Sequence, residues 1–388
     1  MKILVSTDKY KGSLSALEVC TIIGNAIRKV DKSIEVVVGL MADGGEGTVD
    51  TLVESEKGRY VKVRVKDPLG KVINSKFGII KKDIAVIEMA LASGLWLVPH
   101  DKRNPMETTA YGTGELIRKA LDMGCRKVII GIGGSATTDG GMGMAQALGV
   151  KFYDENENLL GFGGKELSRL RKIDISGIHS RVYSTEFLVA CDVDNPLTGR
   201  RGAVYVYSPQ KGADKHMVEE LDKGLINFAK VIKKDLGNDI RNLKGAGAAG
   251  GLGAGLVAFL DAKLRRGTDI VIETTNLRQK MSGVDLVITG EGVLDKQTFF
   301  GKSAYGVAKL AKEYNVPVVT INGSVLVSRE KMGLENSKLF SGNFSIINKP
   351  MGLEEAIRDS RKLLENITRE VITFYLDATK TAKKRLIR

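Results

Sequence analysis

The sequence has 388 residues, of which 43% are hydrophobic, 6% aromatic and 27% charged, and its formal net charge is +13. This composition excludes a disordered chain, and the length favours two domains over a single hydrophobic core. Basic residues are spread among acidic ones and form no stripe, so no nucleic-acid partner is expected; a positive field would instead attract a small anionic substrate and a nucleotide.

Short apolar runs alternate along the chain with patterns of helical period. Strands are expected at residues 2–7, 35–41, 60–66, 72–80, 84–89, 127–132, 186–191, 286–289, 316–321 and 338–345. Helices are expected at residues 16–30, 114–123, 141–148, 217–236, 253–264, 303–314 and 353–376. This alternation indicates an α/β fold with parallel sheets. The dense basic run at residues 380–388 is interpreted as a solvated helix end.

The expected elements also suggest how the chain divides into domains. The pattern of residues 1–41 resembles that of residues 285–347, whereas residues 60–89 string strands together through a Pro-Leu-Gly turn. We therefore expect a discontinuous α/β domain built from both chain ends. This domain comprises residues 1–70 plus 285–388, and a second α/β domain is inserted between them at residues 71–284.

Cysteines and apolar segments indicate the compartment. Cys20, Cys125 and Cys191 are isolated, which predicts neither a disulfide framework nor a zinc site and is typical of a reducing compartment. The chain enters a strand at once, without a signal peptide, and its most apolar stretch, residues 84–98, is too short to span a bilayer. A cytoplasmic protein without a membrane partner is expected.

The first candidate motif is the turn between the first strand and the first helix. Ser13 or Ser15 could cap this helix, and Lys11 beside Gly12 lies where an ammonium group could reach a phosphate at the helix N-terminus. The spacing is not that of a Walker A loop. An ordinary capped turn explains the residues equally well.

The second motif, residues 41–48, follows the second strand. Asp43 and Glu46 offer oxygen ligands for Mg²⁺, and three glycines would let a ligand approach the backbone. A simple capping loop is an equally good interpretation.

The third motif, Gly131–Gly143, follows an apolar β-branched run and precedes a helical stretch. Its backbone N–H groups could bind an anion, and Ser135, Thr137 and Thr138 add hydroxyl groups. It matches a dinucleotide fingerprint only loosely and contains no lysine. We therefore interpret it as an acceptor cradle in preference to a triphosphate loop.

The fourth motif ends the strand at residues 186–191. Asp192 or Asp194 could accept a hydroxyl proton or hold a metal, because ligands of α/β folds meet the carboxyl ends of strands. An Asx turn before Pro196 is the alternative.

Two further motifs lie in the second half of the chain. The run Gly245–Gly255 could mean close helix packing or a phosphate cradle that leads into a helix. Glu291 and Asp295 follow another strand, with Lys302 nearby. Phosphoryl transfer needs parts of these kinds: backbone donors for phosphates, carboxylates for Mg²⁺, a cation and a carboxylate base.

Taken together, these segments resemble the bacterial glycerate kinase family over about residues 1–325. The motifs that carry the resemblance are residues 11–16, 42–48, 112–117, 133–137, 139–141, 209–213, 245–253, 289–292 and 297–298. The resemblance implies a two-domain α/β kinase with an active-site cleft between the domains, one of them flavodoxin-like and built from both chain ends. It implies ATP and Mg²⁺ as cosubstrates and D-glycerate as acceptor, with 2-phosphoglycerate favoured over 3-phosphoglycerate. A homodimer is compatible with it.

Three departures from the family pattern are visible. The family usually has Ser-Phe where this chain has Lys9-Tyr10, and Asn where it has Thr138. The family position of Asp194 is often uncharged, which favours Asp192 as the functional carboxylate.

The resemblance and the motifs together give each candidate residue a role. Asp192 would orient or deprotonate the acceptor hydroxyl, and Lys11 would neutralise the transferred phosphoryl group. The remaining candidates are Gly134, Ser135 and Arg103 for the glycerate carboxylate, Gly12, Ser13, Gly247, Gly250 and Gly251 for the nucleotide phosphates, and Asp43, Glu291 and Asp295 for Mg²⁺.

Three other functions compete with this interpretation. The first is a kinase of another small hydroxy acid. The second is a non-catalytic nucleotide-binding regulator, which would be expected to lose Lys11 or Asp192, although both are present. The third is a nucleic-acid binder, which the lack of a recognised module disfavours.

Overall fold

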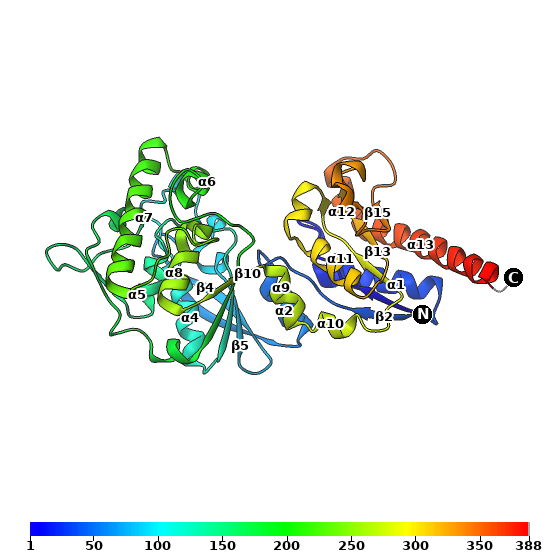
Figure 1. Ribbon diagram of the computed structural model, residues 1–388, viewed down its shortest axis with the longest axis horizontal. Helices are drawn as coiled ribbons and strands as arrows, with labels where there is room; N and C mark the ends of the chain where they lie inside the picture. The colour runs from blue at the N-terminus through cyan, green and yellow to red at the C-terminus, as the bar shows by residue number, and fades with distance from the viewer. Residues whose placement is uncertain (387–388) are drawn as a thin grey trace. The chain divides into compact units, whose positions relative to one another are not determined.

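The computed structural model describes residues 1–386, and the chain forms two compact units (Figure 1). The first unit combines Met1–Asp43 with the residues from Val271 onward, and the second spans Gly44–Ile270. The first boundary, expected between residues 70 and 71, therefore lies between residues 43 and 44. The second boundary, expected between residues 284 and 285, lies between residues 270 and 271. Two hairpin pairings cause the first displacement, because they draw residues 59–80 into the sheet of the second unit.

The first unit contains a parallel sheet with the strand order β15-β13-β11-β1-β2. Numbered by their order in the chain, these strands run 2-1-3-4-5, which is the flavodoxin-like order, and the order reverses between β1 and β11. The elements are β1 Lys2–Val5, α1 Ala16–Val30, β2 Glu35–Val38, α10 Leu277–Lys280, β11 Leu286–Thr289, β12 Val293–Leu294, α11 Ser303–Glu313, β13 Val318–Asn322, β14 Ser324–Val325, α12 Leu334–Ser337, β15 Gly342–Ser345 and α13 Leu353–Leu386.

Helix α1 shows how local sequence places an element on this sheet. Ser15 is its N-cap and forms a capping box with Glu18, which satisfies two backbone donors of the first turn. Val19, Ile23 and Ile27 recur every four residues, so they share one buried face. This face joins the core of the sheet, and α1 also packs against α13 (Figure 1).

The second unit contains a mixed sheet with the strand order β10-β9-β6-β5-β4-β3. The strands from β10 to β5 are parallel, whereas β4 and β3 add antiparallel hairpins. The elements are α2 Thr48–Ser55, β3 Arg59–Lys66, β4 Val72–Ile80, β5 Ile84–Glu88, α3 Ala90–Ser93, α4 Tyr111–Asp122, β6 Lys127–Gly131, α5 Met142–Ala147, β7 Lys151–Tyr153, β8 Lys172–Asp174, β9 Glu186–Ala190, α6 Ala203–Tyr207, α7 Lys215–Leu236, α8 Leu252–Leu260 and β10 Lys263–Arg265. Helix α9, Gly267–Thr274, crosses the boundary between the units.

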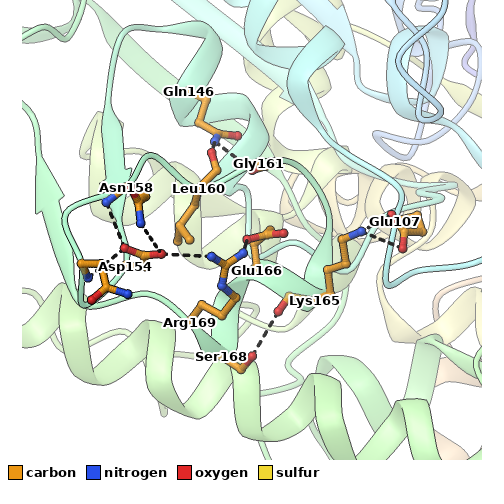
Figure 2. Close-up of polar contacts among 11 residues, drawn as sticks. Glu107, Gln146, Asp154, Asn158, Leu160, Gly161, Lys165, Glu166, Ser168 and Arg169 are labelled. Carbon is orange, nitrogen blue, oxygen red and sulfur yellow. Dashed lines mark hydrogen bonds and ion pairs between the residues drawn. The ribbon is translucent and has the colours of Figure 1, made fainter.

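A polar network holds the irregular segment that follows β7 (Figure 2). The carboxylate of Asp154 accepts hydrogen bonds from backbone N–H groups of its own turn and from Arg169, whose guanidinium also donates to Glu166 at 2.9 Å. Gln146 of α5 donates to two backbone carbonyls of the same segment. These bonds satisfy backbone groups that no strand or helix pairs.

The expected α/β fold with parallel sheets is confirmed, and the differences are local. The helix expected at residues 253–264 ends at Leu260, because Asp261 adopts a left-handed conformation, and β10 follows. The strand expected at residues 338–345 is only β15, since a turn and the short helix α12 precede it. The basic run at residues 380–388 begins within α13, and its last two residues lie outside the described part. Within residues 1–386, no helix is long and apolar enough to cross a bilayer.

Candidate active site

Four carboxylates line a cavity of about 620 Å³ in the first unit. Asp8 follows β1, Asp43 follows β2 and Glu291 follows β11, so three neighbouring parallel strands deliver them to one edge of the sheet. Asp295 is the fourth. The cavity therefore lies at the carboxyl edge, where the strand order reverses and where open α/β sheets bind ligands.

Burial raises the pKa of the two carboxylates nearest the reversal point. Burial and the charge of Asp43 raise the pKa of Asp8 to about 6, against hydrogen bonds donated by Ser303 and the Lys9 backbone. Burial also raises the pKa of Glu291 to about 7, opposed by Thr298 and by the ammonium group of Lys302. Oε1 of Glu291 is buried and has no hydrogen-bond partner among residues 1–386. An additional cation would relieve this electrostatic cost.

Two of the residues predicted to hold Mg²⁺, Glu291 and Asp295, have different hydrogen-bonding environments. Oδ1 of Asp295 accepts the backbone N–H groups of Gln297 and Thr298, so this residue caps a short helix, and it lies 3.7 Å from Lys302. Among the described residues, no three acidic, histidine or cysteine side chains are gathered as a metal site. The unpartnered oxygen of Glu291 nevertheless fits Mg²⁺, which is commonly held by one or two carboxylates together with substrate phosphates.

Hydrogen bonds hold the first βα turn, residues 10–15, in place. The backbone N–H groups of Ser13 and Leu14 both donate to the Tyr10 carbonyl, and the Ser13 hydroxyl donates to Ser360 at 2.8 Å. Ser15, one of the two expected N-caps, is confirmed in that role. Gly12 supplies the left-handed turn at φ +78°. Both donors of Ser13 are thus engaged within the first unit, whereas Lys11 is exposed and lines the cavity with Ser13.

In the second unit, the Gly131–Gly143 loop surrounds a buried lysine that was not among the predicted site residues. Nζ of Lys211 lies 2.8 Å from the Ser135 hydroxyl oxygen and 2.6 Å from the Thr137 carbonyl oxygen. Lys211 is 1% exposed, and burial lowers its pKa to about 7 against the charge of Asp139. The only signal in the sequence was its place in the family motif at residues 209–213.

The hydrogen bond from Lys211 determines which hydrogen bond the Ser135 hydroxyl can still make. The hydroxyl oxygen accepts from the ammonium group, so its own hydrogen remains able to bind another acceptor. Asp139, in the same loop, accepts backbone N–H groups of Ala110, Gly141 and Gly143. These bonds fix the loop against the start of α4.

Arg103, a predicted substrate residue, lies next to this lysine. A Cβ added to Gly212 would lie 2.2 Å from the Arg103 carbonyl oxygen, so the Arg103 backbone packs directly on the residue after Lys211. Nε of Arg103 is buried, and no residue in the described part of the chain accepts a hydrogen bond from it. Gly134, with φ +75°, is exposed beside Ser135. The predicted acceptor residues are therefore brought together around Lys211.

Asp192 lies at the carboxyl edge of the second sheet. It follows β9, and its Oδ1 accepts the backbone N–H of Gly267, which follows β10, at 3.0 Å. Strand β9 pairs with β6, after which the Gly131–Gly143 loop begins. The predicted base and the predicted acceptor loop thus follow adjacent parallel strands.

The glycines predicted to bind nucleotide phosphates have a packing role. A Cβ on Gly250 would lie 1.9 Å from the Thr137 carbonyl oxygen, and one on Gly247 would lie 2.2 Å from the Pro196 carbonyl oxygen. Gly247, Gly250 and Gly251 are all buried. Close packing of two backbone segments accounts for these glycines, and their binding of nucleotide phosphates stays a prediction.

Comparison with known proteins agrees with the resemblance seen in the motifs. The family model of the glycerate kinases matches residues 3–376. The glycerate kinase of Halalkalibacterium halodurans is 46% identical over 95% of this chain and 97% of its own length. The glycerate 2-kinase of Escherichia coli is 47% identical over 92% of this chain and 93% of its own length. A crystal structure from Salmonella typhimurium, provisionally named glycerate kinase 2, superposes with a TM-score of 0.90 at 46% identity, covering 98% of this chain and 99% of that chain.

Proposed function

Because the chain belongs to the glycerate kinase family, a family of phosphotransferases that act on an alcohol group, we propose that it phosphorylates D-glycerate with ATP. The observation that carries this proposal is the family match over residues 3–376. The product is 2-phosphoglycerate in this proposal, which the 47% identity to the glycerate 2-kinase of Escherichia coli supports. A cytoplasmic location and a homodimer remain predictions.

The acceptor carboxylate is bound, in this proposal, by the Gly134–Ser135 backbone, the Ser135 hydroxyl and Arg103. Two observations support this role. Lys211 donates to the Ser135 oxygen and leaves the hydroxyl hydrogen for the ligand, and Arg103 Nε is a buried donor that no described residue accepts from. Both donors suit an anionic carboxylate, because hydrogen bonds to a charged acceptor are stronger than neutral ones.

Asp192 orients the acceptor hydroxyl and accepts its proton as the oxygen attacks phosphorus. The hydrogen bond from the Gly267 backbone to Oδ1 of Asp192 holds this carboxylate at the carboxyl edge of the second sheet. Lys11, whose side chain is exposed, balances the charge of the transferred phosphoryl group.

Magnesium is the remaining part of the proposal. Glu291 is the best-placed ligand, because its buried Oε1 lacks a partner, and Asp43 and Asp295 are the further candidates. When bound, the ion would neutralise phosphate charge and so favour attack on phosphorus.

The test is incubation of the purified chain with D-glycerate and MgATP, followed by ³¹P NMR of the product. The expected result is one phosphomonoester signal that matches 2-phosphoglycerate. A panel of larger hydroxy acids in parallel reactions provides the control. Faster turnover of a longer sugar acid than of glycerate would overturn the substrate assignment.

A further inference from the structure

The lining of the first unit's cavity has two chemically different parts. One part is charged and consists of the carboxylates already described together with Lys9, Lys11 and Lys302. The other part, called the apolar wall below, consists of Val293, Ile346, Ile347, Met351, Leu353 and Ile357. The phosphate-binding chemistry of the charged part does not account for the exposed residues of this apolar wall.

Part of the apolar wall is exposed, whereas Ile346 belongs to the buried core and Met351 packs against it. Leu353 is 76% exposed, and Ile357, one turn later in α13, is 38% exposed. Ile347, which follows β15, is 36% exposed. Exposed aliphatic groups that line one cavity mark a surface that an apolar ligand group would cover.

We propose that this cavity binds the magnesium–nucleotide complex, with the base against the apolar wall and the phosphates beside Lys302. The inference rests on the proposed kinase function. Glycerate is too small and too polar to cover the wall, whereas a purine base is planar, largely apolar and separated from its phosphates by a ribose. A cavity of about 620 Å³ is within the usual range for such ligands.

The charges of the cavity explain why the magnesium complex is the species bound. Four carboxylates line it against three lysines, so the cavity offers no excess of positive charge to a bare triphosphate. Mg²⁺ carried by the nucleotide reverses this balance and gives the buried Glu291 oxygen a partner. Lys302 lies 3.6 Å from Glu291 and 3.7 Å from Asp295, within reach of both the carboxylates and a phosphate.

Two leucines of the first unit form a matched pair for the test. Leu353 begins α13 after Gly352, and Leu334 begins α12 after Gly333. They are 76% and 73% exposed, but only Leu353 lines the cavity. In calorimetric titration of the full chain with MgADP, Leu353→Ser is expected to raise Kd about tenfold, through lost apolar contact with the base. Leu334→Ser is expected to leave Kd within about twofold of the unsubstituted chain.

A second pair of titrations locates the two ends of the nucleotide. Lys302→Met is expected to weaken MgADP about tenfold and AMP less than about twofold, because AMP lacks the distal phosphate. Leu353→Ser is expected to weaken both nucleotides equally, since both carry the base. This contrast distinguishes the proposed orientation of the nucleotide from its reverse.

The outcomes separate this inference from the proposed function. If Leu353→Ser binds MgADP as tightly as Leu334→Ser, the base does not lie on this wall and the inference is overturned. It is overturned equally if Leu353→Ser raises the KM for glycerate and leaves nucleotide binding unchanged. If the expected binding changes occur in a chain that does not phosphorylate glycerate, the nucleotide site stands and the proposed function fails.

Discussion

The ammonium group of Lys211 lies 2.8 Å from the hydroxyl oxygen of Ser135, and both side chains are buried. This contact joins a residue outside the Gly131–Gly143 loop to the hydroxyl that we propose binds the acceptor. The loop geometry therefore depends on a charge from another part of the second unit. The first two predictions follow from this contact.

Replacing the lysine should weaken acceptor binding. Lys211→Met removes the donor to Ser135 and the partner of the buried Thr137 carbonyl, so we expect a loss of about 1–3 kcal/mol in unfolding free energy. The KM for glycerate should rise about tenfold while the KM for ATP stays unchanged, because the proposed nucleotide cavity belongs to the first unit. Denaturant titration and steady-state kinetics measure the two effects.

The matched control is Lys165→Met, which removes a surface lysine of the same unit paired with Glu107 (Figure 2). Exposed pairs contribute little, so stability should change by less than about 0.5 kcal/mol. Equal changes in both KM values in Lys211→Met would contradict a specific role at the acceptor loop.

The buried lysine should also make stability depend on pH. Burial lowers its pKa to about 7 in the folded chain, from an ordinary value of 10.5, so between these values the unfolded chain binds the extra proton. The free energy of unfolding contributed by this group therefore rises with pH across that window and falls as the pH is lowered toward 7. The difference between the unsubstituted chain and Lys211→Met, followed by denaturant titration at several pH values, isolates the effect. A constant difference from pH 7 to about pH 10 would refute it.

Asp192→Asn should remove the proposed base while keeping the hydrogen-bond acceptor for Gly267. We expect kcat to fall about 10²–10⁴-fold, as for loss of a general base. Binding of MgADP should not change, because the proposed nucleotide cavity belongs to the first unit. Asp194→Asn, two residues later and also exposed to solvent, is the control and should retain kcat within about twofold. Full activity of Asp192→Asn would sink the base assignment.

Gly250→Ala should test the packing role of the glycine run. Gly250 has φ +68°, and the added Cβ would lie 1.9 Å from the Thr137 carbonyl oxygen, so we expect a loss of roughly 2–4 kcal/mol in unfolding free energy. Gly237 has a similar φ of +77° with no atom within 4 Å of an added Cβ. Gly237→Ala therefore measures backbone strain alone, about 1–2 kcal/mol. Thermal unfolding of both variants gives the comparison, and equal losses would exclude the clash.

The sequence predicted elements well where their signals are local. Helix α1 begins and ends at the expected residues, because a capping box and an amphipathic pattern define it. Strand β11 also matches, as a short apolar run between turns. Strand β10 was missed: it has only three residues, and pairing with β9 makes it a strand.

The domain boundaries also depend on pairing between segments that are distant in the sequence. Strand β3 belongs to the second unit because β4 pairs with it and with β5, and this pairing involves residues far outside any local window. A pattern of strands and turns indicates that a sheet exists and leaves open which sheet receives each strand.

By itself, the sequence determined the family, the α/β class and most of the candidate residues, because these rest on motifs and periodicities that read along the chain. Only the tertiary structure decided among similar residues. Glu291 and Asp295 look alike in sequence, yet one carries a buried unpartnered oxygen and the other caps a helix. The sequence did not predict Lys211 as a site residue, because its burial beside Ser135 is a result of the tertiary fold. Burial and hydrogen bonding between distant segments set the chemistry of such groups, and no local pattern encodes them.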